Sequence, residues 1–311
     1  MAVTQSQPQL TLPPGRRRHM SDGTLVKLFI MPTLILLILW NVFPLFYSLY
    51  LSFTNYVAIA NQPPQWVGLN NYTFILNNDT LWRSFATTGK YALFSVSIQT
   101  VLGFGLAMLL RQRFRGSGIV TTLLLVPMML SPVVVGLFWK LIYNPSFGIF
   151  NYLLDFSHPS LAPDMLQNGD LALWAVVLVD VWMWTPFVML LCLSGLSAIP
   201  DYLYEAAAID RASSWFQFRR ITLPQVAPLL LIAVLFRSIE AFKAFDVVQG
   251  LTGGGPGNST ETISISLWRL AFQQGQFKTG RASALAYILL VIVIAVSNLY
   301  IRYLNRIKGE N

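Results

Sequence analysis

Residues 200–228 read PDYLYEAAAIDRASSWFQFRRITLPQVAP, a long polar stretch that separates two runs of almost purely apolar sequence. Pro200 and Asp201 suit the first turn of a helix, because the N–H that proline lacks has no partner there and a carboxylate faces the positive end of the helix dipole. Ser214 and Gln217 have the spacing of a capping box, which predicts that a second short helix begins at Ser214.

The second helix of this stretch has one apolar face. Trp215, Phe218 and Ile221 recur at every third residue, and we expect Pro224 and Pro228 to end the helix before the next apolar run. Such a face fits a segment that lies on the lipid headgroups. It also fits a docking element for a separate cytoplasmic protein, which is the interpretation that we favour.

The stretch resembles the "EAA" loop in the membrane subunits of bacterial ATP-binding-cassette (ABC) importers. The matching residues are Glu205, Ala206, Ala207, Asp210, Ala212, Phe218, Ile221, Leu223 and Pro224. In that family the loop sits in a cleft of the ATPase subunit and transmits its closure to the membrane helices. The family usually has glycine where this chain has Arg211, and glycine would allow a turn with positive φ. The resemblance implies that residues 200–228 form an ATPase-coupling loop.

Composition independently indicates a membrane protein. Hydrophobic residues make up 55% and charged residues 11% of the 311-residue chain, and the mean hydropathy is +0.56. A soluble domain carries about 25% charged residues. The net charge of +8 does not indicate nucleic acid, because the basic residues stand at the ends of apolar runs rather than among aromatic residues on a polar face. The single Cys192 allows no intrachain disulfide and suggests no metal site.

Six apolar runs have the roughly 20 residues that a helix needs to cross a bilayer. We place them near 25–53, 84–110, 118–143, 171–195, 225–250 and 282–304. The predicted fold is therefore an all-α polytopic membrane protein with six transmembrane helices. Residues 1–24 are expected to form a disordered cytoplasmic tail, and residues 25–311 one transmembrane domain.

The basic residues predict the orientation of the chain. Twelve of them fall in the N-terminal tail, the second and fourth connectors and the C-terminus: Arg16, Arg17, Arg18, Arg111, Arg113, Arg115, Arg211, Arg219, Arg220, Arg302, Arg306 and Lys308. Four fall on the other side: Arg83, Arg269, Lys278 and Arg281. Since positive charge favours the cytoplasmic side, both termini and residues 200–228 are predicted to be cytoplasmic.

The connectors on the other side add to the resemblance. Residues 66–72 look like the "FVGLxNY" stretch of sugar-type permeases, residues 144–151 like their "NPxxGxxN" loop, and residues 251–256 like their "LTGGGP" turn. Together with the coupling loop, they are similar to the maltose-type and glycerol-phosphate-type carbohydrate branch, from about residue 24 to the C-terminus. The fold implied is the type I ABC importer permease (MetI-like) core in a bacterial cytoplasmic membrane.

The same resemblance implies the partners. They are a second homologous permease, and hence a heterodimer, two ATPase subunits inside and a solute-binding protein outside. No cofactor is expected on this chain, because ATP and Mg²⁺ would be used by the ATPase. The passage would carry a sugar or a sugar-like polyol, and which one is selected would depend on the binding protein.

The fifth predicted span carries four charges at every third position: Arg237, Glu240, Lys243 and Asp246. On one helix they could form a self-neutralising ladder, with Arg237 roughly 18 Å along it from Gln225. They could also line a translocation path, together with Asp180 and Trp184 of the fourth span. Charges inside a span fit a second class as well, an ion-coupled secondary transporter, although we find no internal repeat of the kind such carriers often show.

No enzyme is predicted. The glycine-rich residues 253–257 lack the Lys-Ser/Thr ending of a P-loop, so we expect a flexible turn there. The two histidines, His19 and His158, fall on opposite sides of the predicted membrane and cannot form one catalytic group.

Overall fold

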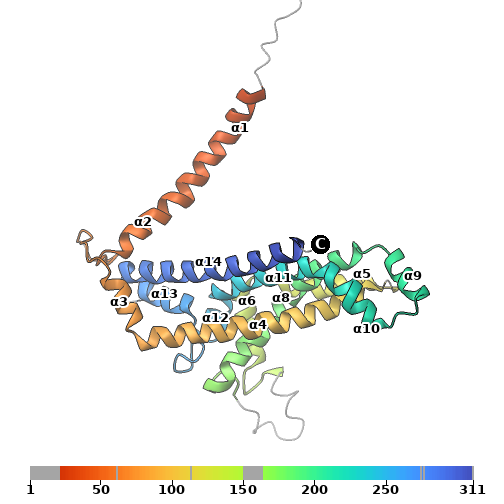
Figure 1. Cartoon of the computed structure of the whole chain (residues 1–311). Coiled ribbons are helices and arrows are strands. Elements are labelled where there is room, and N and C mark those ends of the chain that lie inside the picture. Colours follow the sequence, from red (N-terminus) through yellow and green to blue (C-terminus); the bar gives the residue numbers. More distant parts are fainter. Residues whose placement is uncertain are drawn as a thin grey trace, which may run out of the picture. The chain divides into compact units, whose positions relative to one another are not determined.

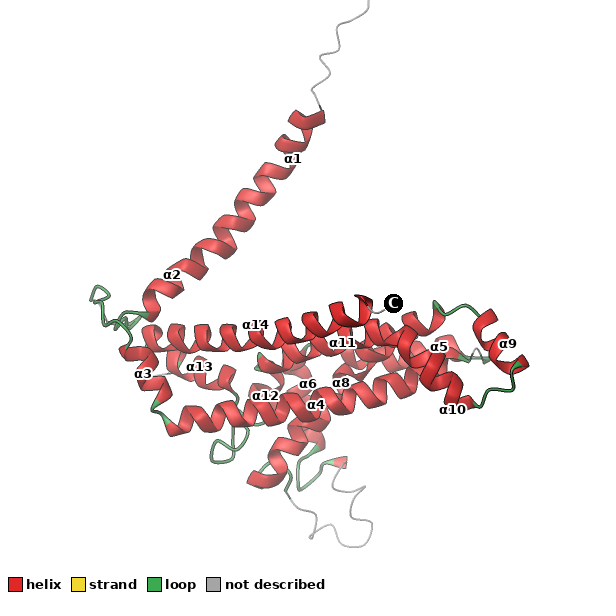
Figure 2. Ribbon diagram, in the orientation of Figure 1, coloured by secondary structure: helices red, strands yellow, loops and turns green. Residues whose placement is uncertain are grey.

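The structure is a computed structural model that describes residues 22–60, 62–112, 114–149, 164–273, 275 and 277–309 (Figures 1 and 2). Arg16 to Arg18, Arg113, Asn151 and both histidines lie outside the described residues. Within the described part, every regular element is a helix, apart from a single antiparallel bridge between Thr54 and Trp66.

The chain divides into two units, Met1–Ser48 and Leu49–Asn311. The first unit contains α1 (Asp22–Leu37), a π-helical turn (Ile38–Val42) and most of α2 (Phe43–Ser52). Residues Val26–Ser52 are long and apolar enough to cross a membrane, as predicted for 25–53. None of the apolar window in this helix is buried within the unit that contains it.

The second unit contains the remaining helices (Figure 1). They are α3 (Asn70–Leu76), α4 (Asp79–Arg111), α5 (Ser117–Leu125), η2 (Pro127–Met129), α6 (Pro132–Ile142), α8 (Gly169–Ser197), α9 (Tyr202–Ile209), α10 (Ser214–Gln217), η3 (Phe218–Thr222), α11 (Leu223–Phe242), α12 (Asp246–Leu251), α13 (Ile263–Phe272) and α14 (Thr279–Gly309).

Five helices of the described chain are long and apolar enough to span a membrane: Val26–Ser52, Asp79–Arg111, Gly169–Ser197, Ser214–Phe242 and Thr279–Arg306. The chain is thus an all-helical polytopic membrane protein with five clear spans and additional short apolar helices. The expectation of one continuous helix over 118–143 is wrong, because this run is divided into α5, a 3-10 turn and α6. Pro127 and Pro132 each lack an N–H and begin new helical pieces there.

The fifth predicted span, 225–250, is interrupted as well. Helix α11 ends at Phe242, and α12 starts again at Asp246. The short helices α6 and α12 pack closely, since a Cβ on Gly136 would lie 2.9 Å from the carbonyl oxygen of Val247, and a Cβ on Gly250 would lie 2.9 Å from that of Val133. The helical pieces that follow the two interruptions therefore pack directly against each other.

Three long helices, α4, α8 and α11, pack against one another and form the core of the second unit (Figure 1). Helices α4 and α8 approach so closely at Gly103 that a Cβ there would lie 2.7 Å from Cβ of Val188. Their facing side chains are buried in two apolar clusters, one around Val179 and one around Met189. A polar residue on any of these inner faces is therefore shielded from lipid and from bulk water.

The glycine-rich connector after α12 is not the flexible turn that we expected. Oγ1 of Thr260 donates to the carbonyl oxygen of Gly255 (2.8 Å) and lies 2.7 Å from Oγ1 of Thr252. Arg269 of α13 donates to the carbonyl oxygen of Gly253 (2.9 Å) and forms an ion pair with the buried Glu261. Two threonines of the loop itself and Arg269 of the following helix thus brace this loop with hydrogen bonds.

Candidate functional site

The coupling-loop residues begin with α9, which carries three of the matched positions on different faces. Glu205 and Ala206 are exposed, whereas Ala207 is only 8% exposed. A substitution at Ala207 would therefore act first on the packing of this chain, and Ala206 is the alanine that another protein can reach.

Helix α9 ends in a Schellman motif centred on Arg211. The N–H of Arg211 donates to the carbonyl oxygen of Ala208 (3.1 Å), and the N–H of Ala212 donates to that of Ala207 (2.9 Å). This pattern needs a residue with positive φ just after the helix, and Arg211 has φ of +54°. The turn that glycine would favour is thus retained, with an arginine in a strained conformation.

We expect Arg211→Gly to stabilise the protein by up to about 1 kcal/mol, because it removes the clash of Cβ at positive φ. A rise in the melting temperature of the purified permease would show this. Arg211→Ala is the matched control, since it removes the exposed side chain but keeps Cβ, and it should give no rise. A lower melting temperature for Arg211→Gly would contradict the strain argument.

The second helix of the loop begins as predicted, but with a different cap. Oγ of Ser213, not of Ser214, accepts the N–H of Phe216 (3.3 Å), so the capping-box assignment is wrong by one residue. The expected end at Pro224 and Pro228 is also wrong. Helix α10 continues through the π-helix η3 into α11, and both prolines lie within this continuous helix, Ser214–Phe242.

Helices α9 and α10 enclose a groove of about 520 Å³. It is lined by Leu203, Ala206, Ala207, Asp210, Ala212, Ser213, Phe216 and Ile221. The structure thus brings together four of the predicted coupling residues around one concave surface. Glu205 and Arg211 lie on the exposed surface outside the groove lining, and Leu223 and Pro224 lie in the first turn of α11.

The second candidate site is a buried polar cluster in the core of the helix bundle. Nη2 of Arg237, on α11, donates to both carboxylate oxygens of Asp180, on α8, at 3.1 and 3.2 Å. Each of these residues is 3% exposed. The guanidinium carbon of Arg237 also lies 4.7 Å from the centre of the Trp184 ring. A charge buried in a membrane domain is stable only with such partners.

Gln99 of α4 completes the cluster, and sequence analysis missed it. Its amide nitrogen donates to Oδ2 of Asp180 (2.7 Å), and its amide oxygen accepts Nε–H of Arg237 (2.9 Å). Gln99 is fully buried. Its signal in the sequence was the single amide side chain of the second predicted span, and this signal was missed because an amide carries no charge.

The predicted ladder of four charges on one helix is wrong. Nζ of Lys243 does donate to Oε1 of Glu240 (2.8 Å), but Arg237 pairs with α8, and Asp246 belongs to α12. Helix α11 ends at Phe242, so its axis does not continue through Lys243 and Asp246.

All six predicted path residues nevertheless surround one small pocket of about 90 Å³. Its lining is Tyr91, Pro132, Asp180, Trp184, Arg237, Glu240, Lys243, Ala244, Phe245, Asp246 and Val247. The break between α11 and α12 lies at this pocket and places backbone as well as side-chain polar groups in its wall. The pocket therefore combines aromatic, cationic and anionic groups from α4, α8, α11 and α12.

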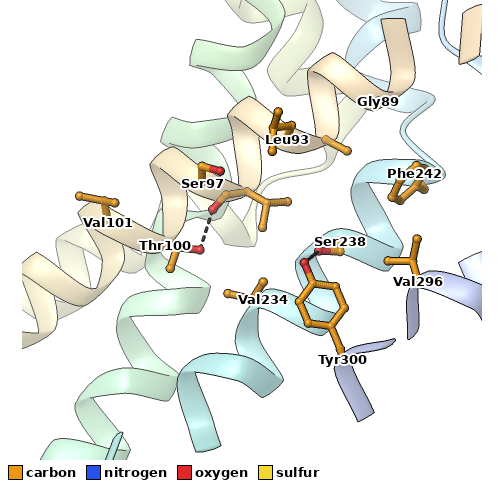
Figure 3. Close-up of a pocket in the computed structure, with 12 residues that line it drawn as sticks. Gly89, Leu93, Ser97, Thr100, Val101, Val234, Ser238, Phe242, Val296 and Tyr300 are labelled. Carbon is orange, nitrogen blue, oxygen red and sulfur yellow. Dashed lines mark hydrogen bonds between the residues drawn. The ribbon is translucent and has the colours of Figure 1, made fainter. Parts of the chain in front are cut away.

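A larger groove of about 550 Å³ lies between α4, α11 and α14 (Figure 3). Most of its lining is apolar, and two of its hydroxyls donate hydrogen bonds within the protein. Thr100 donates to the carbonyl oxygen of Val96 (2.6 Å), and Ser238 donates to the hydroxyl of Tyr300 (3.3 Å). The smaller pocket has five charged side chains in its wall, so it is the better candidate for contact with a polar solute.

The comparisons with known proteins establish the family. Residues 99–307, about two thirds of the chain, match the family described as "Binding-protein-dependent transport system inner membrane component". The chain is 35% identical to the trehalose/maltose transport system permease protein MalF of Thermococcus litoralis, over 90% of this chain and 94% of that protein. This chain therefore belongs to the binding-protein-dependent transport system inner membrane component family.

Solved structures agree on the fold. A bacterial alginate ABC transporter, in complex with its alginate pentasaccharide-bound periplasmic protein, contains a chain with a TM-score of 0.78 at 20% identity, covering 89% of this chain and 93% of that one. A chain of the MetNI methionine ABC transporter has a TM-score of 0.53 at 13% identity, covering 76% and 98%. The predicted type I permease core is confirmed.

This chain is accordingly a multi-pass inner membrane permease subunit of an ABC importer, and ATP hydrolysis takes place on a partner ATPase. An ion-coupled secondary transporter, the other class considered, does not fit this family. Among the residues that the structure describes, no group of three histidine, cysteine or acidic side chains is placed to hold a metal ion.

Proposed function

We propose that this chain forms half of a passage for a neutral sugar, with the pocket beside Asp180 and Arg237 as part of the translocation path. The support from similarity is the 35% identical relative, a trehalose/maltose permease. The support from the site is the pocket itself, where Trp184 and Tyr91 offer aromatic surfaces and Glu240 and Lys243 offer hydrogen bonds. Sugars present both an apolar ring face and hydroxyl groups.

The charges of the pocket favour a neutral sugar over a phosphate ester. Three carboxylates, Asp180, Glu240 and Asp246, stand against two cations, Arg237 and Lys243. Both cations already bind a carboxylate within the protein. A phosphate ester would have to displace these pairs and approach an excess of negative charge. We infer that the carbohydrate carried is uncharged, such as a disaccharide or a short oligosaccharide.

We further propose that residues 25–311 act as one transmembrane domain and that α9 and α10 bind an ATPase subunit in the cytoplasm. The full assembly would add a second permease, a pair of ATPases and an extracytoplasmic solute-binding protein. Both termini would be cytoplasmic, which agrees with twelve basic residues on that side against four on the other. An ATPase can bind α9 and α10 only in this orientation, so loss of ATPase binding in Ala206 variants tests both statements.

The substrate class is tested with the solute-binding protein of the same transport system. We expect trehalose, maltose or a related neutral oligosaccharide to raise its melting temperature, because a ligand at 100 times its Kd stabilises by about 2.7 kcal/mol. Cells that lack this permease should lose uptake of the same radiolabelled sugar. Stabilisation by glycerol phosphate, with none by neutral sugars, would contradict the proposal.

A further inference from the structure

Tyr204 of α9 joins the proposed coupling segment to two long helices. Its ring centre lies 4.2 Å from the guanidinium carbon of Arg111, the last residue of α4. Its hydroxyl lies 2.9 Å from Oγ1 of Thr222, the last residue of η3, and the next residue begins α11. One side chain thus contacts the end of α4 and the start of α11.

The hydrogen bond between Tyr204 and Thr222 joins two hydroxyl groups. The two hydroxyls lie 2.9 Å apart and either can be the donor, and Oγ1 of Thr222 also lies 3.4 Å from the carbonyl oxygen of Gln217. Thr222 is 2% exposed, which shelters this bond from competing water. The bond therefore ties α9 directly to the π-helix, where the backbone departs from regular α-helical geometry.

The contact with Arg111 is also well placed. A cation at the last turn of α4 is favoured by the helix dipole, and an arginine over a tyrosine face is attracted by the ring quadrupole. Tyr204 packs on the apolar cluster that includes Leu110 and Val226, from α4 and α11. The same side chain thus combines a cation–π contact with α4, a hydrogen bond to η3 and packing on an apolar cluster that α4 and α11 share.

The chain itself connects α9 to the next helix only through the short turn around Arg211. By contrast, α10, η3 and α11 form one continuous helix from Ser214 to Phe242. A force applied to α10 can pass along this helix. Helix α9 is joined to α8 and α10 only through the short turns 198–201 and 210–213, so the contacts of Tyr204 give it a direct link to α4 and η3. We infer that Tyr204 is a positioning residue for transport, which makes α9 move together with α4 and α11 as one body.

This inference rests on the proposed binding of an ATPase to α9 and α10, and it can fail while that proposal stands. The test uses the complete transporter, with nitroxide labels at Leu93 of α4 and Ile209 of α9, which are 64% and 83% exposed. Cys192, the single cysteine, is replaced by alanine so that it takes no label. The distance between the labels is measured by pulsed electron resonance with and without Mg²⁺ and a non-hydrolysable ATP analogue.

In the parent transporter we expect one narrow distance distribution that the nucleotide does not shift, because α9 and α4 move together. In Tyr204→Phe, which keeps the ring over Arg111 but loses the hydroxyl, the distribution should widen and shift when nucleotide is added. Thr222→Val should reproduce this change, Thr222→Ser should not, and the double variant Tyr204→Phe/Thr222→Val should be no worse than either single one. A purely structural role would change the melting temperature but not the response to nucleotide.

Tyr202→Phe is the matched control, because Tyr202 lies on the same helix with 64% of its surface exposed. It should behave like the parent. The inference is overturned if Tyr204→Phe behaves like the parent, if Tyr202→Phe changes as much, or if the parent distance itself shifts with nucleotide. Tyr204→Phe should retain the ATPase, and its loss would instead place Tyr204 in the docking surface and overturn the positioning role. A different result would contradict the proposal that the ATPase binds α9 and α10. That result is normal ATPase binding by a variant with a large side chain in the groove, Ala206→Trp.

Discussion

Arg237→Met should leave little folded permease in the membrane. The substitution removes the cationic partner of Asp180, which is 3% exposed and would keep only neutral side-chain donors, the amide of Gln99 and the hydroxyl of Tyr91, among the bonds described for it. Breaking a buried ion pair from one side costs about 3–5 kcal/mol, because an uncompensated charge stays in a medium of low dielectric. That is a large part of the free energy of unfolding of a typical domain. The amount of membrane-inserted protein and its melting temperature measure the effect.

Two further variants test whether the loss of folded protein comes from the unpaired charge of Asp180. Lys243→Met is the control, since the pair of Lys243 and Glu240 is about half exposed and should contribute under about 1 kcal/mol. Asp180→Leu combined with Arg237→Met replaces the whole pair with apolar groups, a change that is often neutral or stabilising. It should restore folded protein but not sugar uptake, because Asp180 and Arg237 form part of the proposed path. Restored uptake would limit the pair to a structural role, and an unchanged melting temperature in Arg237→Met alone would contradict both.

The class of fold could be predicted from the sequence because the hydrophobicity of a membrane span is a sum over many residues. A run of about 20 apolar residues is a membrane helix almost regardless of their order, so Val26–Ser52 and Gly169–Ser197 were found within a few residues of their ends. The positions of breaks depend on single residues. Pro127 and Pro132 divide the third run, whereas Pro186 and Pro228 lie inside continuous helices. Whether a helix breaks or continues at a proline depends on how neighbouring helices pack around it. The local sequence pattern carries no information about that packing.

For the candidate sites too, the sequence predicted what is local in the chain and missed what is not. Residues of the coupling loop are contiguous in the chain, so a local resemblance located Ala206, Asp210 and Arg211 together. The buried cluster joins residues that are far apart, since 138 positions separate Gln99 from Arg237. Regular spacing by three suggested that Arg237 pairs along its own helix, but the tight packing of α4, α8 and α11 offers it Asp180 in a buried site instead. Long-range pairs of this kind require the tertiary structure.

Ala206→Trp should release the ATPase from a permease that remains folded. Ala206 is exposed and lines the groove between α9 and α10, so a large side chain there fills space that the partner would occupy. Overpacking costs about 1–3 kcal/mol, which corresponds to about fivefold to 150-fold weaker binding. Glu205→Lys should act in the same direction by reversing an exposed charge beside the groove. Co-purification of the ATPase with a tagged permease, together with sugar uptake, measures both effects.

Two positions on the same helix separate docking from folding in this experiment. Ala208 is exposed but does not line the groove, so Ala208→Trp should bind the ATPase and transport normally. Ala207 is buried within the chain, so Ala207→Trp should lower the melting temperature of the permease itself, which Ala206→Trp should not. Ala206→Trp with a fully bound ATPase and normal uptake would show that the groove is not the docking surface. Equal losses in Ala206→Trp and Ala208→Trp would mean that the ATPase binds the exposed face of α9 as a whole, and not the groove.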